Sequence, residues 1–253
     1  MINQLGLRNS ILSALPAEAF AALRPHLHSR RLKARDVIQE PKRRIQHLDF
    51  LESGLVSSRT LTADSILETA MIGFRSAVNI SLVLGWDQSS SQTTVIVPGT
   101  TLRIETDDLR RAAQDHPVIR EHLIRHTHAL TVHAAQIALC GARHPLEQRV
   151  ACWVSLACGT SESKVIPLTH GDLSITLGIR RASIAEALAQ FESKGIIRKT
   201  RGSIEVTDGQ TLKQSACGCL NVIENAYLAA SQLCKGVQHS KAFRAWECET
   251  RPM

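Results

Sequence analysis

The sequence has no uninterrupted apolar run of about 18 residues, so no transmembrane helix and no membrane partner are expected. Its first residues lack the basic-then-apolar layout of a secretory signal, which predicts a cytoplasmic protein. There is no Cys-x-x-Cys pair, and the seven cysteines are odd in number. This pattern argues against a disulfide framework and favours reduced, mostly buried thiols.

The sequence also lacks the short motifs of common enzymes. It contains no His-Glu-x-x-His, no nucleophile elbow and no glycine-rich phosphate loop, so we expect a protein that is not an enzyme and has no cofactor. The remote alternative is a metal-dependent hydrolase built on the histidine-rich segment 116–144. Its candidate ligands are His122 and His126, one helical turn apart, but no Glu-x-x-His motif or carboxylate second shell accompanies them.

Residues 31–106 consist of short apolar runs separated by polar or glycine-containing turns. A spacing of roughly 8 to 15 residues predicts a compact antiparallel barrel or sandwich. Two turn signals, at 52–54 and 98–99, separate some of the runs. The expected strands are 48–51, 55–56, 66–71, 82–84, 95–97 and 101–104.

Residues 117–142 predict one long helix with Pro117 at its start. Apolar and histidine residues recur along it at alternating steps of four and three, the pattern of a coiled-coil seam. Histidines in such a seam would set its register or respond to pH or metal. We expect a dimer seam formed by Ile119, Leu123, His126, Leu130, His133, Ile137 and Cys140.

Residues 169–208 predict a winged helix-turn-helix. Thr169 and Asp172 form a capping box at the start of a first helix, and Gly178 supplies the left-handed residue that a tight connection needs. The second helix, from about Arg180 to Lys194, has one apolar stripe at helical spacing. That stripe is Ile184, Ala187, Leu188 and Phe191.

The opposite face of this second helix suits the major groove of DNA, because its outward residues near the N-terminus are small or hydrogen-bonding. After Gly195, residues 196–199 and 203–207 predict a β-hairpin that carries Arg198, Lys199 and Arg201. The net charge of +7 and the pI of about 9.3 agree with a polyanionic partner. These features together predict a protein that binds double-stranded DNA.

Several segments share their pattern with one known family. They are 50–57, 97–100, 143–149, 168–169, LGIRRAS at 177–183, 195–198, 201–204 and ACGC at 216–219. On these segments, which span about residues 10–228, the sequence resembles the Crp/Fnr superfamily of bacterial transcription regulators.

The resemblance implies an α+β protein with three parts. These are a cyclic-nucleotide-binding-like β-roll over residues 1–112, a dimerisation helix over 113–143 and a winged helix-turn-helix over 144–228. Residues 229–253 are expected to form a loose, disordered tail. Such a protein regulates transcription as a homodimer on a pseudo-palindromic site, with RNA polymerase as a further partner.

The resemblance also implies site residues on the second helix. Arg181, Ala182 and Glu186 take the base-reading positions, where Arg181 could bridge a guanine and Glu186 could accept from a cytosine. Ala182 departs from the commoner glutamate and can meet only a thymine methyl. Phosphate contacts are expected from Thr169, Arg180, Ser183, Arg198, Lys199 and Arg201.

The sensor half lacks the binding residues from which its effector could be identified. The family's cyclic-nucleotide cassette has Gly-Glu roughly ten residues before an Arg-Ser or Arg-Thr, and no Gly-Glu precedes Arg75-Ser76 here. The first cysteine is Cys140, so an iron–sulfur cluster on N-terminal cysteines is not expected. Cys217 and Cys219 could ligate a soft metal only with partners from elsewhere. The effector stays unknown, and a constitutive regulator with a degenerate sensor is the alternative.

Overall fold

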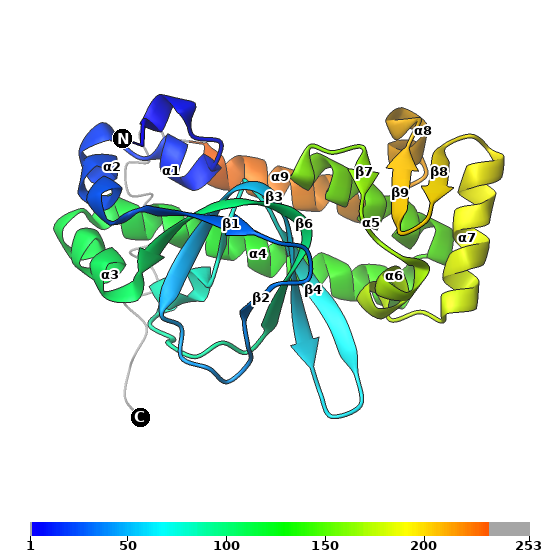
Figure 1. Cartoon of the computed structure of the whole chain (residues 1–253), viewed down its shortest axis with the longest axis horizontal. Coiled ribbons are helices and arrows are strands. Elements are labelled where there is room, and N and C mark those ends of the chain that lie inside the picture. Colours follow the sequence, from blue (N-terminus) through cyan, green and yellow to red (C-terminus); the bar gives the residue numbers. More distant parts are fainter. Residues whose placement is uncertain (1, 233–253) are drawn as a thin grey trace, which may run out of the picture.

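The structure is a computed structural model that describes residues 2–232 (Figure 1). The first lobe contains η1 (Gln4–Gly6), α1 (Ser10–Ala14), α2 (Ala17–Leu23), η2 (Arg24–His26), β1 (His28–Leu32), β2 (Val37–Gln39), β3 (His47–Leu61), β4 (Ile66–Ile72), β5 (Ala77–Val78), η3 (Ile80–Leu84), β6 (Gln92–Glu105) and α3 (Thr106–Asp115). The rest of the described chain forms α4 (Pro117–Arg143), α5 (Leu146–Ser161), β7 (Val165–Ile166), α6 (His170–Leu177), α7 (Arg181–Ser193), β8 (Ile197–Thr200), β9 (Ser203–Val206), α8 (Gly209–Gln214) and α9 (Cys219–Ser231). None of these helices is long and apolar enough to cross a membrane.

The first lobe is an antiparallel β-roll, which confirms the expected fold class. Its strands follow the order β1-β6-β3-β4, while β2 also pairs with β6 and β5 with β3. The long strands β3 and β6 pair from His47 opposite Glu105 to Arg59 opposite Gln92. Apolar residues of these strands pack against α1, α2 and α3 and form the core of the roll.

The two turn signals of the sequence lie inside these long strands, so the prediction that they separate strands is wrong. Gly54 of β3 (φ +89°) and Gly99 of β6 lie where the strand register shifts. A Cβ on Gly54 would lie 2.6 Å from the Val97 carbonyl oxygen, and one on Gly99 would clash with the Ser53 carbonyl oxygen. The glycines therefore permit a close backbone approach at bulges, which a sequence pattern does not distinguish from a turn.

The strand predicted at 82–84 is also wrong, because these residues end the 3-10 helix η3. Left-handed residues bound this helix at both ends, with Asn79 at φ +67° and Gly85 at φ +84°. A short apolar run fits a buried helical turn as well as it fits a strand, so periodicity alone could not decide.

The expected domain boundary at 112/113 falls inside α3. The long helix α4 begins and ends within a residue of its predicted bounds. The first half of α4 packs against the β-roll and η3, and its second half lies beside α9 (Figure 1). Across this second contact the Nδ1 atom of His133 lies 3.1 Å from the Tyr227 hydroxyl oxygen. The two helices thus bring the C-terminal segment back onto the first lobe. Residues 229–231 of the expected tail instead form the end of α9, and residues 233–253 lie outside the described part of the chain.

Most positions of the dimer seam predicted along α4 are buried within the single chain. Ile119, Leu123, His126, His133 and Cys140 are at most 7% exposed within the single chain, where they face the β-roll or α9. Leu130 and Ile137 are half-buried. A side chain that packs inside its own chain is not available to a symmetry mate. A second stripe with the same alternating steps is exposed instead: Ile124, His128, Thr131, Ala135, Ala138 and Ala142.

The C-terminal lobe is built around α5, whose side chains from Val150 to Ala157 are all buried. Helices α7, α8 and α9 pack against it, and the three-stranded sheet β7-β9-β8 closes one side. The lobe also touches the β-roll, because α6 packs against β4. The helix-turn-helix is therefore in direct contact with the sensor-like sheet.

Candidate nucleic-acid interface

Helix α6 begins with the capping box that the sequence predicted. The Thr169 hydroxyl oxygen accepts a bond of 3.1 Å from the Asp172 amide, and the Asp172 carboxylate accepts one of 2.9 Å from the Thr169 amide. The same hydroxyl also donates to the Asp172 carboxylate at 2.7 Å. The box fixes the start of α6 and engages the hydroxyl that was expected to contact phosphate.

The connection between α6 and α7 is held by local bonds. Gly178 ends α6 in the left-handed region at φ +64°, as the sequence predicted. The Ser174 hydroxyl donates to the carbonyl oxygen of Ile179, and the Arg149 guanidinium donates a bond of 2.7 Å to that of Leu177. Because Arg149 comes from α5, the turn is fixed to the core of the lobe.

Helix α7 presents the expected base-reading residues to solvent. Ile184, Ala187, Leu188 and Phe191 are buried, as predicted, and hold the helix against the lobe. Arg181, Ala182 and Glu186 are exposed on the opposite side, and Ser183 is half-buried beside them. In Figure 1 this helix lies at the edge of the molecule farthest from the β-roll, beside the β8–β9 hairpin.

The wing is a β-hairpin in the predicted place, with Lys199 opposite Ile204 and Arg201 in the turn. Two of its cations are already paired with carboxylates. Arg198 donates to Glu205 at 2.9 Å, and the Lys199 ammonium lies 2.8 Å from a Glu192 oxygen. Their charges are therefore partly neutralised within the chain.

Three cations near the α7 face have no carboxylate oxygen within 4.0 Å in the described part of the chain: Arg180, Arg181 and Arg201. All three are exposed. Two of them begin α7, where the helix dipole adds to the positive potential, and the third lies in the wing turn. Their positions define a cationic surface around the exposed end of the helix.

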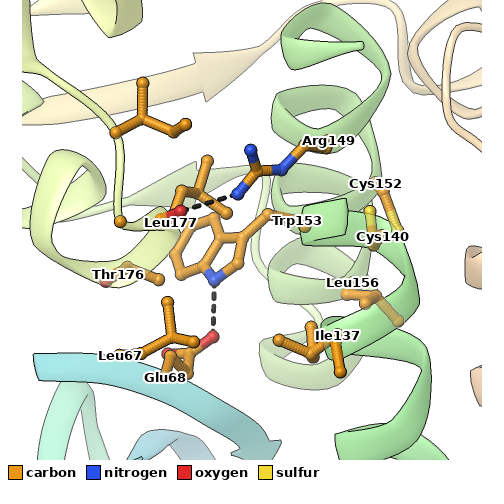
Figure 2. A pocket seen from close by; sticks show the side chains of 14 residues that line it. Leu67, Glu68, Ile137, Cys140, Arg149, Cys152, Trp153, Leu156, Thr176 and Leu177 are labelled. Atoms are coloured by element: carbon orange, nitrogen blue, oxygen red, sulfur yellow. Dashed lines mark hydrogen bonds between the residues drawn. The ribbon is translucent and has the colours of Figure 1, made fainter. Parts of the chain in front are cut away.

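A cavity of about 430 Å³ lies between the two lobes, beside α4 (Figure 2). Leu67 and Glu68 of β4 line one side, and Trp153 of α5 and Thr176 of α6 line the other. The Trp153 indole nitrogen donates a bond of 2.6 Å to Glu68 across this cavity. The indole and the carboxylate are thus a direct link between the sensor-like sheet and the DNA-binding lobe.

Burial raises the pKa of Glu68 to about 7, although bonds from Ser57 and Trp153 act in the opposite direction. Glu68 is not among the site residues that the sequence predicted. Its only signal is a single carboxylate within the apolar run 66–71, at a position that alternation would not expose.

A second cavity, of about 380 Å³, lies between the β-roll and α4. Hydroxyl groups of Ser58, Thr69, Ser81, Thr93, Thr127 and Thr131 line it. No charged side chain of the described residues lines it, so nothing there would neutralise a phosphate. Arg75, the residue that superficially resembled a phosphate ligand, does not line this cavity.

The histidines proposed for a hydrolase do not form a site with a third ligand. His122 and His126 are buried, and no group of three potential ligands in residues 2–232 includes either of them. A different set of side chains, Cys140, His144, Cys217 and Cys219, does bring more than three potential metal ligands together. The sequence does not show that these four residues are close in space.

The described geometry is that of a winged helix-turn-helix domain attached to a β-roll by a long helix, which is the architecture of one class of transcription regulators. Residues 148–215 match the Crp-like helix-turn-helix domain family. No curated protein sequence matches the chain.

Three solved structures illustrate the fold. FixK2 from Bradyrhizobium japonicum is 15% identical with a TM-score of 0.62, over 76% of this chain and 98% of that one. The c-di-GMP responsive regulator CLP of Xanthomonas campestris is 16% identical with a TM-score of 0.62, over 76% and 99%. A Crp/Fnr-family transcriptional regulator from Thermus thermophilus is 17% identical with a TM-score of 0.57, over 75% and 98%.

Residues 148–215 therefore form a Crp-like helix-turn-helix domain, and the described chain has the same fold as solved Crp/Fnr-family regulators. The expectation of a Crp/Fnr-type transcription-regulator fold with a helix-turn-helix DNA-binding domain is thereby confirmed.

Proposed function

We propose that the protein is a homodimeric transcription regulator that reads a two-fold symmetric DNA site through α7 of each chain. The observation that carries this proposal is the exposed start of α7, where the charges of Arg180, Arg181 and Arg201 have no carboxylate partner among residues 2–232. A helix that presents small and hydrogen-bonding side chains beside cations suits insertion into a major groove.

The residues divide into base readers and phosphate contacts. Arg181 and Glu186 would read bases, while Ala182 would allow close approach to a thymine methyl. Arg180, Arg201 and Ser183 would contact phosphates. Arg198, Lys199 and Thr169 would contribute less than the sequence implied, because each is engaged by a carboxylate of its own chain.

The exposed stripe of α4 is the proposed dimer contact. Ile124, Thr131 and Ala138 follow one another at intervals of seven residues, and His128, Ala135 and Ala142 do the same. Together they form a heptad pattern that nothing in residues 2–232 covers. Small alanines at four-three spacing would allow two copies of α4 to approach closely.

An effector, if the protein uses one, would occupy the cavity beside α4. Its hydroxyl lining favours a neutral, polar ligand over a phosphate. Thr131 belongs both to this cavity and to the proposed dimer stripe, so a ligand there could shift the helix contact. The alternative of a constitutive regulator rests on the missing cyclic-nucleotide cassette. RNA polymerase as a partner is proposed from the likeness to Crp/Fnr regulators. A cytoplasmic location and the absence of enzymatic activity are proposed from the signals and motifs that the sequence lacks.

Selection of bound sequences from a random DNA pool tests the proposal. We expect a two-fold symmetric motif whose half-sites are separated by about one helical turn. Enrichment of an asymmetric single site would contradict dimeric recognition. Retention without any sequence preference would contradict base reading by α7.

A further inference from the structure

Four side chains with metal-ligating atoms meet where α4 ends and α9 begins. They are Cys140, His144, Cys217 and Cys219, and one ligand atom from each lies within 4.8 Å of all the others. The three cysteines are at most 7% exposed, and His144 is half-buried. Three thiols and an imidazole in one such cluster are a ligand set that zinc prefers.

The local structure explains how the four residues converge. Cys140 and His144 are four residues apart at the C-terminal end of α4, so their side chains project from the same side of the helix. Cys217 and Cys219 flank the start of α9, where the helix N-terminus favours a thiolate. The antiparallel contact between α4 and α9 brings the two pairs together.

The separations agree with tetrahedral coordination. The sulfur atoms of Cys140 and Cys217 are 3.5 Å apart, and the Cys219 sulfur lies 3.6 Å from the His144 Nδ1 atom. In a tetrahedral zinc site, with zinc–sulfur bonds of about 2.3 Å and zinc–nitrogen bonds of about 2.0 Å, two sulfurs lie about 3.8 Å apart and a sulfur and a nitrogen about 3.5 Å apart. The other pairs of ligand atoms lie at most 4.8 Å apart, so binding of the ion would draw the four ligand atoms closer together.

From this cluster we infer a structural zinc site with Cys140, His144, Cys217 and Cys219 as its four ligands. Four protein ligands leave no open position for water or substrate, so the site is structural rather than catalytic. It fixes the last turn of α4 to the segment that leaves the winged helix. That connection spans the His144–Pro145 junction, where the DNA-binding lobe leaves α4.

Two other arrangements of the thiols are distinguishable from this one. Cys152 of α5 lies beside Cys140 and could replace one ligand (Figure 2). Cys140 and Cys217 could alternatively form a disulfide, for which the sulfurs would have to approach to about 2.0 Å. The cysteines of the described chain are all free. The test therefore has to separate zinc, a different ligand set and a disulfide.

The experiment measures metal content of the full-length protein, purified without added metal and dialysed against a chelator, by mass spectrometry of the elements. We expect one zinc per chain in the parent and at least a tenfold loss in Cys217→Ser. Cys152→Ala, a matched change of a buried cysteine beside the cluster, should keep its zinc. His144→Ala alters a half-buried residue and should fold, but should release zinc to the chelator more rapidly.

Cobalt substitution provides a readout that does not depend on folding of a variant. Cobalt bound to the parent should show the intense visible absorption of a tetrahedral thiolate site, and His144→Ala should shift it. Parent protein without zinc and without cobalt absorption would overturn the site. Loss of zinc in Cys152→Ala would overturn the ligand set. A Cys140–Cys217 disulfide in the non-reduced protein, found by mass spectrometry, would also overturn the proposal.

Discussion

The Trp153 indole nitrogen donates a hydrogen bond of 2.6 Å to the Glu68 carboxylate, and this bond joins α5 of the DNA-binding lobe to β4 of the β-roll. Glu68 is 1% exposed and Trp153 is 2% exposed, so the contact is excluded from water. A buried bond to a titratable group makes the lobe contact dependent on the protonation of that group.

Glu68 should make the native state less stable as the pH rises. Its pKa is raised from 4.5 to about 7 in the native state, whereas the unfolded chain ionises near the lower value. Between these values the unfolded state binds fewer protons, so the free energy of unfolding falls by up to about 3 kcal/mol as pH increases. Glu68→Gln cannot ionise and should gain stability over the parent across this window. Urea unfolding at several pH values measures the difference.

Glu147→Gln, an exposed carboxylate of α5, is the control for that experiment and should keep the parent's pH dependence. The comparison with the parent at each pH cancels contributions from other groups. If Glu68→Gln and the parent differed by the same amount at every pH, the raised pKa would be wrong.

The buried histidines of α4 should make the native state less stable as the pH falls. Burial lowers the pKa values of His126 and His133 from 6.5 to about 4, so the native state keeps both rings neutral. The unfolded chain binds protons below about pH 6.5, and stability should therefore fall as pH decreases from there towards about 4. Each ring contributes at most about 3 kcal/mol.

A titration followed by nuclear magnetic resonance checks these two rings directly. Neither should protonate between about pH 8 and about pH 5, while the fold is intact. The exposed His28 provides the control, since His28→Gln should leave the acid-induced loss of stability unchanged. Protonation of His126 or His133 near its ordinary pKa would show that the ring is open to water.

Arg181 should determine base preference. Arg181→Ala is expected to cost about 1–3 kcal/mol at one base pair of each half-site and to relax specificity there, because its two donors are lost. Selection from a random DNA pool with this variant measures the effect. An unchanged motif would remove Arg181 from the reading surface. Gln190→Ala, on the exposed distal part of α7, is the control.

The wing cations should contribute unequally to DNA affinity. Arg201→Ala should weaken binding to all sequences alike and reduce the dependence of affinity on salt by about one ion. Lys199→Ala should have a smaller effect, since the Lys199 ammonium already lies 2.8 Å from Glu192. Glu192→Gln should release Lys199 and make the salt dependence steeper. Equal slopes for Arg201→Ala and Lys199→Ala would contradict this difference.

The exposed stripe of α4 should hold two chains together. Ala135→Arg would place a charge at its centre and should convert the dimer to monomer, because a charge at a closely packed helix contact is costly to bury. Light scattering coupled to size exclusion measures the mass. Ala17→Arg, the same change at an exposed position of α2, should leave the dimer intact. A dimeric Ala135→Arg would place the contact on another surface.

The sequence by itself determined the winged helix-turn-helix. Its capping box, its left-handed Gly178, the buried stripe of α7 and the hairpin depend on residues close together in the chain, so local physical chemistry is enough to specify them. For the β-roll, the sequence predicted an antiparallel β fold but not the bounds of its long strands. Gly54 and Gly99 indicated turns, and only the pairing of β3 with β6 shows that they allow two backbones to approach closely.

Only the tertiary structure shows which face of α4 is buried and which distant side chains lie close together. Helix α4 has two stripes at alternating steps of four and three, and the more apolar one packs on the β-roll and α9, which leaves the other exposed. Glu68 and Trp153 are 85 residues apart in the chain, and Cys140 and Cys217 are 77 apart. No local pattern encodes such contacts, because they arise only when separate elements bury their apolar faces against one another.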